Sequence, residues 1–289
     1  MPPLSATFDG AFLGAGIEAI YAGVDWLSCT LPTGSPREQS WLLTCIHLID
    51  EVEDMGYERE VYSRNGYDGV GAGGCFVGTR DDGTYLQLSG HHAGDLLDRI
   101  TRDDLHISRL DIQTTVKYRE YAPGVGKVCY DDATDANGTL PASRRRRIWY
   151  MAGNDGGWTT YIGAPTSEQR AKVYNKAVQS NTPEYERCWR WEVTAKNDYA
   201  TAWYRRVIAE ENTRPALCAS IVASWFALRG ITPVWAPYIR LIALPLIKEV
   251  PSDAEKKLSW LKAQVRPALR WLIDNGFNDE ALKALGIMD

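Results

Sequence analysis

The stretch ISRLDIQTTVKY, from Ile107 to Tyr118, alternates apolar and polar side chains, which is the pattern of a β-strand with two different faces. One face is apolar, and the other carries side chains that bear charge or form hydrogen bonds: Arg109, Asp111, Gln113 and Thr115. The segment CWRWEVT repeats this pattern, because Arg190 and Glu192 project away from its two tryptophans. If both strands lie in one sheet with helices on the apolar face, their polar rows share the open face.

Asp111 and Glu192 are then the first candidates for a chemical site. Two carboxylates within reach of each other repel unless a cation lies between them, and carboxylate oxygens suit a hard divalent ion. We therefore expect this pair to bind Mg²⁺ or Mn²⁺. The alternative is a salt-bridge ladder in which each acid pairs with the arginine of its own strand, Arg109 or Arg190.

The segment AKVYNKAV, residues 171–178, supplies a third group. As a strand, it places Lys172, Tyr174 and Lys176 on one face, so that a phenol lies between two ammonium groups. A tyrosine needs nearby positive charge, a base or a metal to act as a nucleophile at neutral pH. Lys176 would also neutralise a phosphate. The alternative is that these side chains form ordinary solvated surface.

Four consecutive arginines precede an aromatic pair in SRRRRIWY. Such a run is either a solvated loop or a docking site for a phosphate backbone, with the neighbouring rings available for base stacking. The whole chain has a net charge of −5, so a basic groove would be local. The residues expected to contact DNA are Arg109, Gln113, Arg144, Arg145, Arg146, Arg147, Lys172 and Arg190.

The order of elements predicts an α+β fold. A strand ending before Pro32, a helix between Ser35 and Gly56, and a meander of short strands precede the opening stretch. Residues 119–143 are expected to be irregular, four β-like segments follow, and the pattern becomes helical from Asn197. We expect residues 1–200 to form an antiparallel β-sheet core with helices on one face. Residues 201–289 would form an α-helical region that packs on this core or contacts DNA or a partner.

Composition excludes several classes of protein. The longest apolar stretches are interrupted well before the roughly 20 residues that a membrane-spanning helix needs. The N-terminal segment lacks the features of a signal peptide, and the six cysteines are too far apart for a zinc motif. We therefore expect a cytoplasmic protein with buried free thiols and no membrane partner.

Five motifs in order, GVDWLSCTL, YLQLSG, RLDIQTTV, TTYIGAPTSEQRAKVYNKAVQ and WRWEVTAK, resemble the replication initiation factor family. This family comprises rolling-circle plasmid replication initiators and related relaxases, and the resemblance covers roughly residues 20–200. It implies a nuclease core in which Tyr174 is the catalytic nucleophile of a DNA nickase. It also implies that Lys176 assists at the phosphate, and that Asp111 and Glu192 hold the divalent metal.

The chain departs from the family pattern at three positions. Thr115 stands where a second acid is frequent, so either one metal ligand is missing or Gln113 or His106 supplies it. The turn GAPTS has Pro165 where arginine is usual, and Lys172 also replaces an arginine.

The resemblance implies a site-specific endonuclease and strand transferase that forms a 5′-phosphotyrosine intermediate on plasmid or related DNA. Its partners would be a single-stranded or cruciform origin with flanking duplex, a helicase, and a second copy of the chain. One alternative is a non-catalytic, sequence-specific DNA-binding protein on the same scaffold. Another is an enzyme that acts on a different phosphodiester or on a small molecule.

Overall fold

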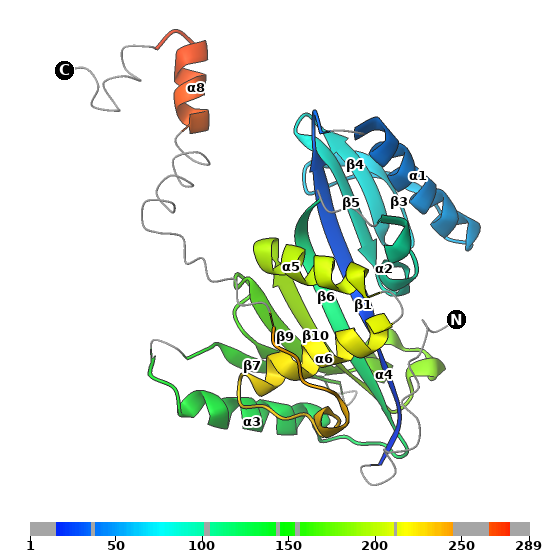
Figure 1. Cartoon of the computed structure of the whole chain (residues 1–289), viewed down its shortest axis with the longest axis vertical. Helices are drawn as coiled ribbons and strands as arrows, with labels where there is room; N and C mark the ends of the chain where they lie inside the picture. The colour runs from blue at the N-terminus through cyan, green and yellow to red at the C-terminus, as the bar shows by residue number, and fades with distance from the viewer. Residues whose placement is uncertain are drawn as a thin grey trace, which may run out of the picture. The chain divides into compact units, whose positions relative to one another are not determined.

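A single antiparallel sheet of ten strands organises the computed structural model, in the order β2-β3-β4-β5-β1-β6-β10-β9-β8-β7 (Figure 1). The model describes residues 16–35, 38–100, 105–142, 145–153, 157–210, 213–244 and 266–277. The strands are β1 (Ile17–Pro32), β2 (Glu60–Arg64), β3 (Tyr67–Ala72), β4 (Cys75–Arg80), β5 (Gly83–Ser89), β6 (His106–Tyr118), β7 (Ile148–Ala152), β8 (Trp158–Ile162), β9 (Gln169–Asn175) and β10 (Cys188–Lys196).

The two longest strands, β1 and β6, lie at the centre and pair with each other. Both are rich in β-branched and aromatic residues, which fit a pleated, buried surface. The strand expected to end before Pro32 runs from Ile17 to Pro32 itself, and its pairing with β6 shifts register between Val24 and Trp26. This irregularity lies at Asp25, a residue of the candidate site described below.

Helices cover one face of the sheet. Those that pack on this face are α1 (Glu38–Asp54), α3 (Val125–Gly138), α5 (Asn197–Ala209) and α6 (Arg214–Ala227). The other described helices are α2 (His91–Asp95), α4 (Lys176–Ser180) and α8 (Arg266–Asp274), and short 3₁₀ turns lie at Leu97–Ile100, Pro183–Tyr185 and Ala236–Tyr238. The helices α5 and α6 cross the central strands, α1 packs on β3 and β4, and α3 packs on β7, β8 and β9 (Figure 1). The predicted class, an antiparallel sheet with helices on one face, is confirmed.

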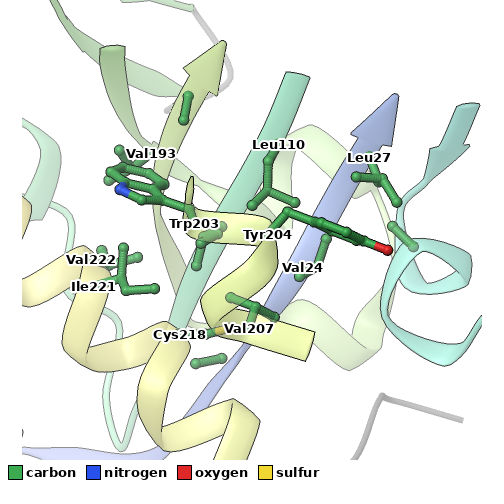
Figure 2. Packing of buried hydrophobic residues seen from close by; sticks show 14 of the residues in the cluster. Val24, Leu27, Leu110, Val193, Trp203, Tyr204, Val207, Cys218, Ile221 and Val222 are labelled. Carbon is green, nitrogen blue, oxygen red and sulfur yellow. The ribbon is translucent and has the colours of Figure 1, made fainter. Parts of the chain in front are cut away.

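The core lies between the sheet and these helices. Figure 2 shows side chains of α5 and α6 gathered with side chains of the central strands: Val24, Leu27, Leu110, Val193, Trp203, Tyr204, Val207, Cys218, Ile221 and Val222. Each is buried, and full burial of a side chain such as leucine or valine stabilises the fold by about 1.5–3 kcal/mol. The apolar face of the opening stretch is therefore the face that packs.

The expectation of an irregular segment over residues 119–143 is wrong, because α3 occupies Val125–Gly138. Its apolar side is narrow, with Cys129 and Ala133 buried among many polar residues, so its helical period is weak in the sequence. Gly126 lets this helix approach the sheet closely, since a Cβ there would lie 2.2 Å from Trp158 Cδ1. Tertiary packing thus decides this helix.

Two compact units divide the chain, residues Met1–Pro245 and Leu246–Asp289. The expected division after residue 200 does not coincide with this boundary, because α5 and α6 pack against β6 and β1 within the first unit. All six cysteines are buried and free. Among the described residues, no helix has the length and hydropathy to cross a membrane.

Candidate active site on the open face of the sheet

The polar row of the opening stretch faces away from the core helices, and β10 and β9 continue it across the sheet. Glu192 on β10 lies directly opposite Gln113 on β6 and Lys172 on β9. Asp111 is opposite Thr194, so the two candidate metal ligands are diagonal neighbours on adjacent strands. The sheet therefore brings together the two acids, which are distant in the sequence.

Glu192 is the centre of the site and is only 1% exposed. Its Oε1 lies 2.9 Å from Lys172 Nζ, and its Oε2 accepts a hydrogen bond of 3.1 Å from the Tyr174 hydroxyl. Burial raises the pKa of the Glu192 carboxyl, Lys172 opposes this shift, and the negative charge of Asp111 adds to it. The influence of Asp111 supports the expected proximity of the two carboxylates.

Tyr174 is 6% exposed and lies on β9 opposite Arg190. Burial and the adjacent Glu192 charge raise the pKa of the phenol well above its ordinary value. The flanking cations therefore do not create a phenolate in the resting protein. Activation requires a base, and Glu192 already accepts the hydrogen bond from this hydroxyl.

The salt-bridge alternative is right for one acid and wrong for the other. Asp111 pairs with Arg109 of its own strand, whose Nε donates a hydrogen bond of 2.9 Å. Arg109 also lies over the Trp26 ring, with its guanidinium carbon 4.5 Å from the centroid. Glu192, in contrast, pairs with Lys172 and not with Arg190. Both carboxylates are neutralised by basic side chains.

Arg190 pairs with an acid from another strand. Its Nη1 lies 2.6 Å from Asp25 Oδ1, and its Nε donates to Thr115 Oγ1 at 2.9 Å. The Thr115 hydroxyl in turn donates to Gln113 Oε1 at 2.7 Å. Burial opposes the charge of Arg190, but Asp25 and neighbouring groups outweigh this and raise its pKa. Arg190 and Gln113, both expected to contact DNA, thus belong to an internal hydrogen-bond network.

Lys176 is not part of the β9 strand, so the predicted alternation is wrong at this residue. The strand ends at Asn175, whose side chain caps the short helix α4 by accepting from the amides of Ala177 and Val178. Lys176 nevertheless remains close to the phenol, with Nζ 5.9 Å from the Tyr174 ring centroid. Burial and the positive charge of Arg190 lower its pKa to about 8. It is therefore a lysine that can release a proton near neutral pH.

A cavity of about 450 Å³ adjoins this cluster. Lys176, Arg190, Asp25 and Gln113 line it, together with Tyr185, whose ring centroid is 5.1 Å from Lys176 Nζ. Tyr185 and Asp25 were not candidates from the sequence. An acid within the otherwise apolar and aromatic GVDWLS strand was a usable signal for Asp25, whereas nothing local distinguishes Tyr185.

The arginine run lies elsewhere. Arg145, Arg146 and Arg147 are exposed and line a separate cavity of about 260 Å³, which shares no lining residue with the cavity beside Lys176. Arg144 lies outside the described residues. The single basic groove expected from the sequence is thus divided between two places.

The donor chemistry at Asp111 and Glu192 fits a hard divalent ion, because both carboxylates are buried and near enough to interact, and the Gln113 amide is adjacent. His106, the other residue considered, is exposed at the first position of β6. Within the described part of the chain, no cluster of three or more His, Cys, Asp or Glu side chains forms a metal site. Solvent or substrate oxygens would have to complete the coordination.

The comparisons with known proteins concern the fold. No family model matches the sequence, and no curated protein matches it. The solved structure of the rolling circle replication initiator protein from Geobacillus stearothermophilus is similar, with a TM-score of 0.53 and 18% sequence identity. The match covers 83% of this chain and 91% of that chain. The chain therefore has the fold of a rolling circle replication initiator, as the order of its sequence motifs predicted.

Proposed function

We propose that the chain is a DNA strand transferase of the rolling circle initiator type, which nicks one strand through Tyr174. One observation carries this proposal: β6, β9, β10 and the first residue of α4 bring a phenol, two carboxylates and two lysines together on the face that the core helices leave uncovered. Similarity to a solved replication initiator supports the same general function.

In the proposed reaction, the Tyr174 oxygen attacks the scissile phosphorus and the bond from phosphorus to the 3′ oxygen breaks. The phenol proton passes to Glu192 Oε2, which already accepts a hydrogen bond from it. Lys176 donates a proton to the leaving 3′ oxygen, since a pKa of about 8 suits a general acid at neutral pH. The products are a 5′-phosphotyrosine and a 3′-hydroxyl. Reversal of the attack rejoins the strand without an external energy source.

Mg²⁺ or Mn²⁺ would be held by Asp111 and Glu192, with Gln113 as the third oxygen donor. The ion would supply positive charge to the phosphate in the transition state. Lys172 and Arg109 hold the two carboxylates in the structure, so Lys172 and a divalent ion would compete for Glu192 Oε1.

Movement of the two lysines would let a DNA phosphate reach the buried phenol of Tyr174. Lys172 Nζ lies 5.0 Å and Lys176 Nζ 5.9 Å from the Tyr174 ring centroid. Both ammonium groups are on flexible stems, and a DNA phosphate that pairs with them would draw them away from the ring. Lys172 and Arg109, which are partly exposed, are the DNA contacts we propose at this site.

The test is covalent capture. The protein is incubated with Mn²⁺ and 3′-labelled single-stranded oligonucleotides of randomised sequence, and the adduct is separated on a denaturing gel. Mass spectrometry then identifies the modified tyrosine. Tyr174→Phe should abolish the adduct, whereas the matched control Tyr185→Phe, from the adjoining cavity, should retain it. An adduct that persists in Tyr174→Phe would show that another residue is the nucleophile.

A second candidate function is a non-catalytic, sequence-specific DNA-binding protein on the same scaffold. The observation that favours it is the resting state of the site, in which the phenol is buried and both carboxylates are neutralised. DNA binding that is insensitive to Mg²⁺ and Mn²⁺, without nicking of supercoiled DNA, would select this function over strand transfer.

A further inference from the structure

We propose that the cavity between the β8–β9 turn, the Arg145–Arg147 segment and the end of α6 binds a phosphate group, with Arg229 as its principal cation. This inference rests on the proposed function in one respect, that the phosphate comes from the backbone of bound DNA. It concerns a place different from the scissile phosphate.

The cavity has a volume of about 260 Å³. A water molecule occupies about 30 Å³ in the liquid, so there is room for a tetrahedral oxyanion with several waters. Its basic and polar lining residues are Arg145, Arg146, Arg147, Ser167, Gln169 and Arg229. The cavity is therefore large enough for a phosphate, and four of its lining residues are arginines.

Arg229 is held firmly in position. Its guanidinium carbon lies 3.5 Å from the Trp225 ring centroid, Nη1 donates to the Trp225 carbonyl at 2.9 Å, and Nη2 donates to Gln169 Oε1 at 3.2 Å. Gln169 Oε1 also accepts from Trp225 Nε1 at 2.9 Å. The Nε of Arg229 is buried and has no hydrogen-bond partner among the described residues. A buried unpaired donor is costly, so the guanidinium has capacity for a further acceptor.

The charges here are not neutralised. Among the residues that the structure describes, none of Arg145, Arg146, Arg147 and Arg229 forms an ion pair with a carboxylate. Burial and the positive charge of Arg146 lower the pKa of Arg229 to about 9. An anion placed between the guanidinium groups would relieve this repulsion.

Phosphate is the anion that this arrangement fits best. Several guanidinium groups converge on one cavity, and guanidinium forks match the oxygen geometry of phosphate. Gln169 bonds to Trp225 of α6, so the site lies toward the helix-covered face, whereas Tyr174 and Glu192 lie on the open face. A DNA strand in the active site could reach this cavity only with its flanking segment, so duplex backbone beyond the nick is the proposed source.

Binding of the group is tested with inorganic phosphate as the probe. Calorimetry in chloride buffer of matched ionic strength should detect phosphate binding to the wild type and to the control variant Arg80→Met, whose arginine is already paired with Asp82. Affinity should fall about tenfold in Arg229→Met. Arg146→Met, at an exposed position, should weaken binding as well and serves if Arg229→Met does not fold. Equal binding by all variants, or none by the wild type, would overturn the proposal.

The source of the bound phosphate group is tested with a fluorescent DNA duplex. No divalent ion is present, so that strand cleavage plays no part. Arg229→Met should weaken duplex binding about tenfold and reduce the slope of log affinity against log salt by about one. Phosphate binding without an effect on duplex binding would overturn the DNA assignment and identify a free phosphate as ligand. If the wild type binds both inorganic phosphate and the DNA duplex as expected but forms no covalent adduct, only the strand transferase function is contradicted.

Discussion

Two charged regions of this molecule differ in whether their charged side chains form ion pairs. On the open face, Asp25, Asp111 and Glu192 each pair with a basic side chain, and Arg190, the partner of Asp25, also donates a hydrogen bond to Thr115. Around the β8–β9 turn, in contrast, Arg145, Arg146, Arg147 and Arg229 form no ion pair with a carboxylate among the described residues. The charges of the first region are thus paired within the protein, and the arginines of the second region are not. Occupation of the first must break an existing ion pair, whereas occupation of the second only adds one.

This difference bears on how each region would bind DNA. An internal ion pair competes with metal or phosphate, so the active site would be selective and dependent on the divalent ion. An arginine cluster that lacks an anion would bind phosphate oxygens with little rearrangement and little sequence preference. The proposed functions of the two regions, reaction and anchoring, follow from this contrast.

The largest expected effect is a loss of stability when one ion pair of the open face is removed. Asp25→Asn leaves the buried guanidinium of Arg190 without its carboxylate, and breaking a buried ion pair costs about 3 kcal/mol. Urea denaturation should show this loss. Asp82→Asn, which removes an exposed pair with Arg80, should change the free energy of unfolding by about 0.5 kcal/mol or less.

Arg229→Met completes this comparison, because it removes a guanidinium that no described carboxylate neutralises. Its free energy of unfolding in phosphate-free buffer should fall by about 1–2 kcal/mol, because two hydrogen bonds and the stacking on Trp225 are lost, and this is less than the loss in Asp25→Asn. If Asp25→Asn is as mild as Asp82→Asn, the ion-paired network does not hold the open face together, and the contrast between the regions fails.

The second prediction concerns competition for Glu192. Lys172→Met removes the ammonium group from Oε1, so a divalent ion no longer has to displace it. The Mn²⁺ concentration for half-maximal adduct formation should fall about tenfold, which corresponds to one modest charge interaction. Lys127→Met, in an exposed pair with Asp131, is the control and should leave the Mn²⁺ requirement unchanged. An increased requirement in Lys172→Met would show that Lys172 assists the metal and does not compete with it.

The smallest effect is a pH dependence. Lys176 has a pKa of about 8, so the protonated form required of the general acid decreases above that pH. The rate of adduct formation should be about fourfold lower at pH 8.5 than on the plateau at lower pH. Lys176→Arg keeps its charge through this range and should remove the alkaline decrease while lowering the plateau. The same decrease in Lys176→Arg would assign it to another group.

Much of the fold was accessible from local sequence patterns. The alternation around Asp111 and Glu192 predicted two strands with a shared polar face, and the helix after Ser35 followed from its apolar period and its end at Gly56. The helix α3 was missed because its apolar side is narrow and depends on packing against Trp158 and Trp189. At Lys176 the alternation failed because Asn175 caps a new helix.

Side-chain alternation was sufficient to say which residues of each strand face together, since that depends only on the two-residue period of an extended backbone. Which charges meet across strands depends on register, and register is set by the assembled sheet and its bulges. Tertiary structure alone therefore paired Glu192 with Lys172, joined Arg190 to Asp25, and brought Arg229 to the segment that carries the arginine run.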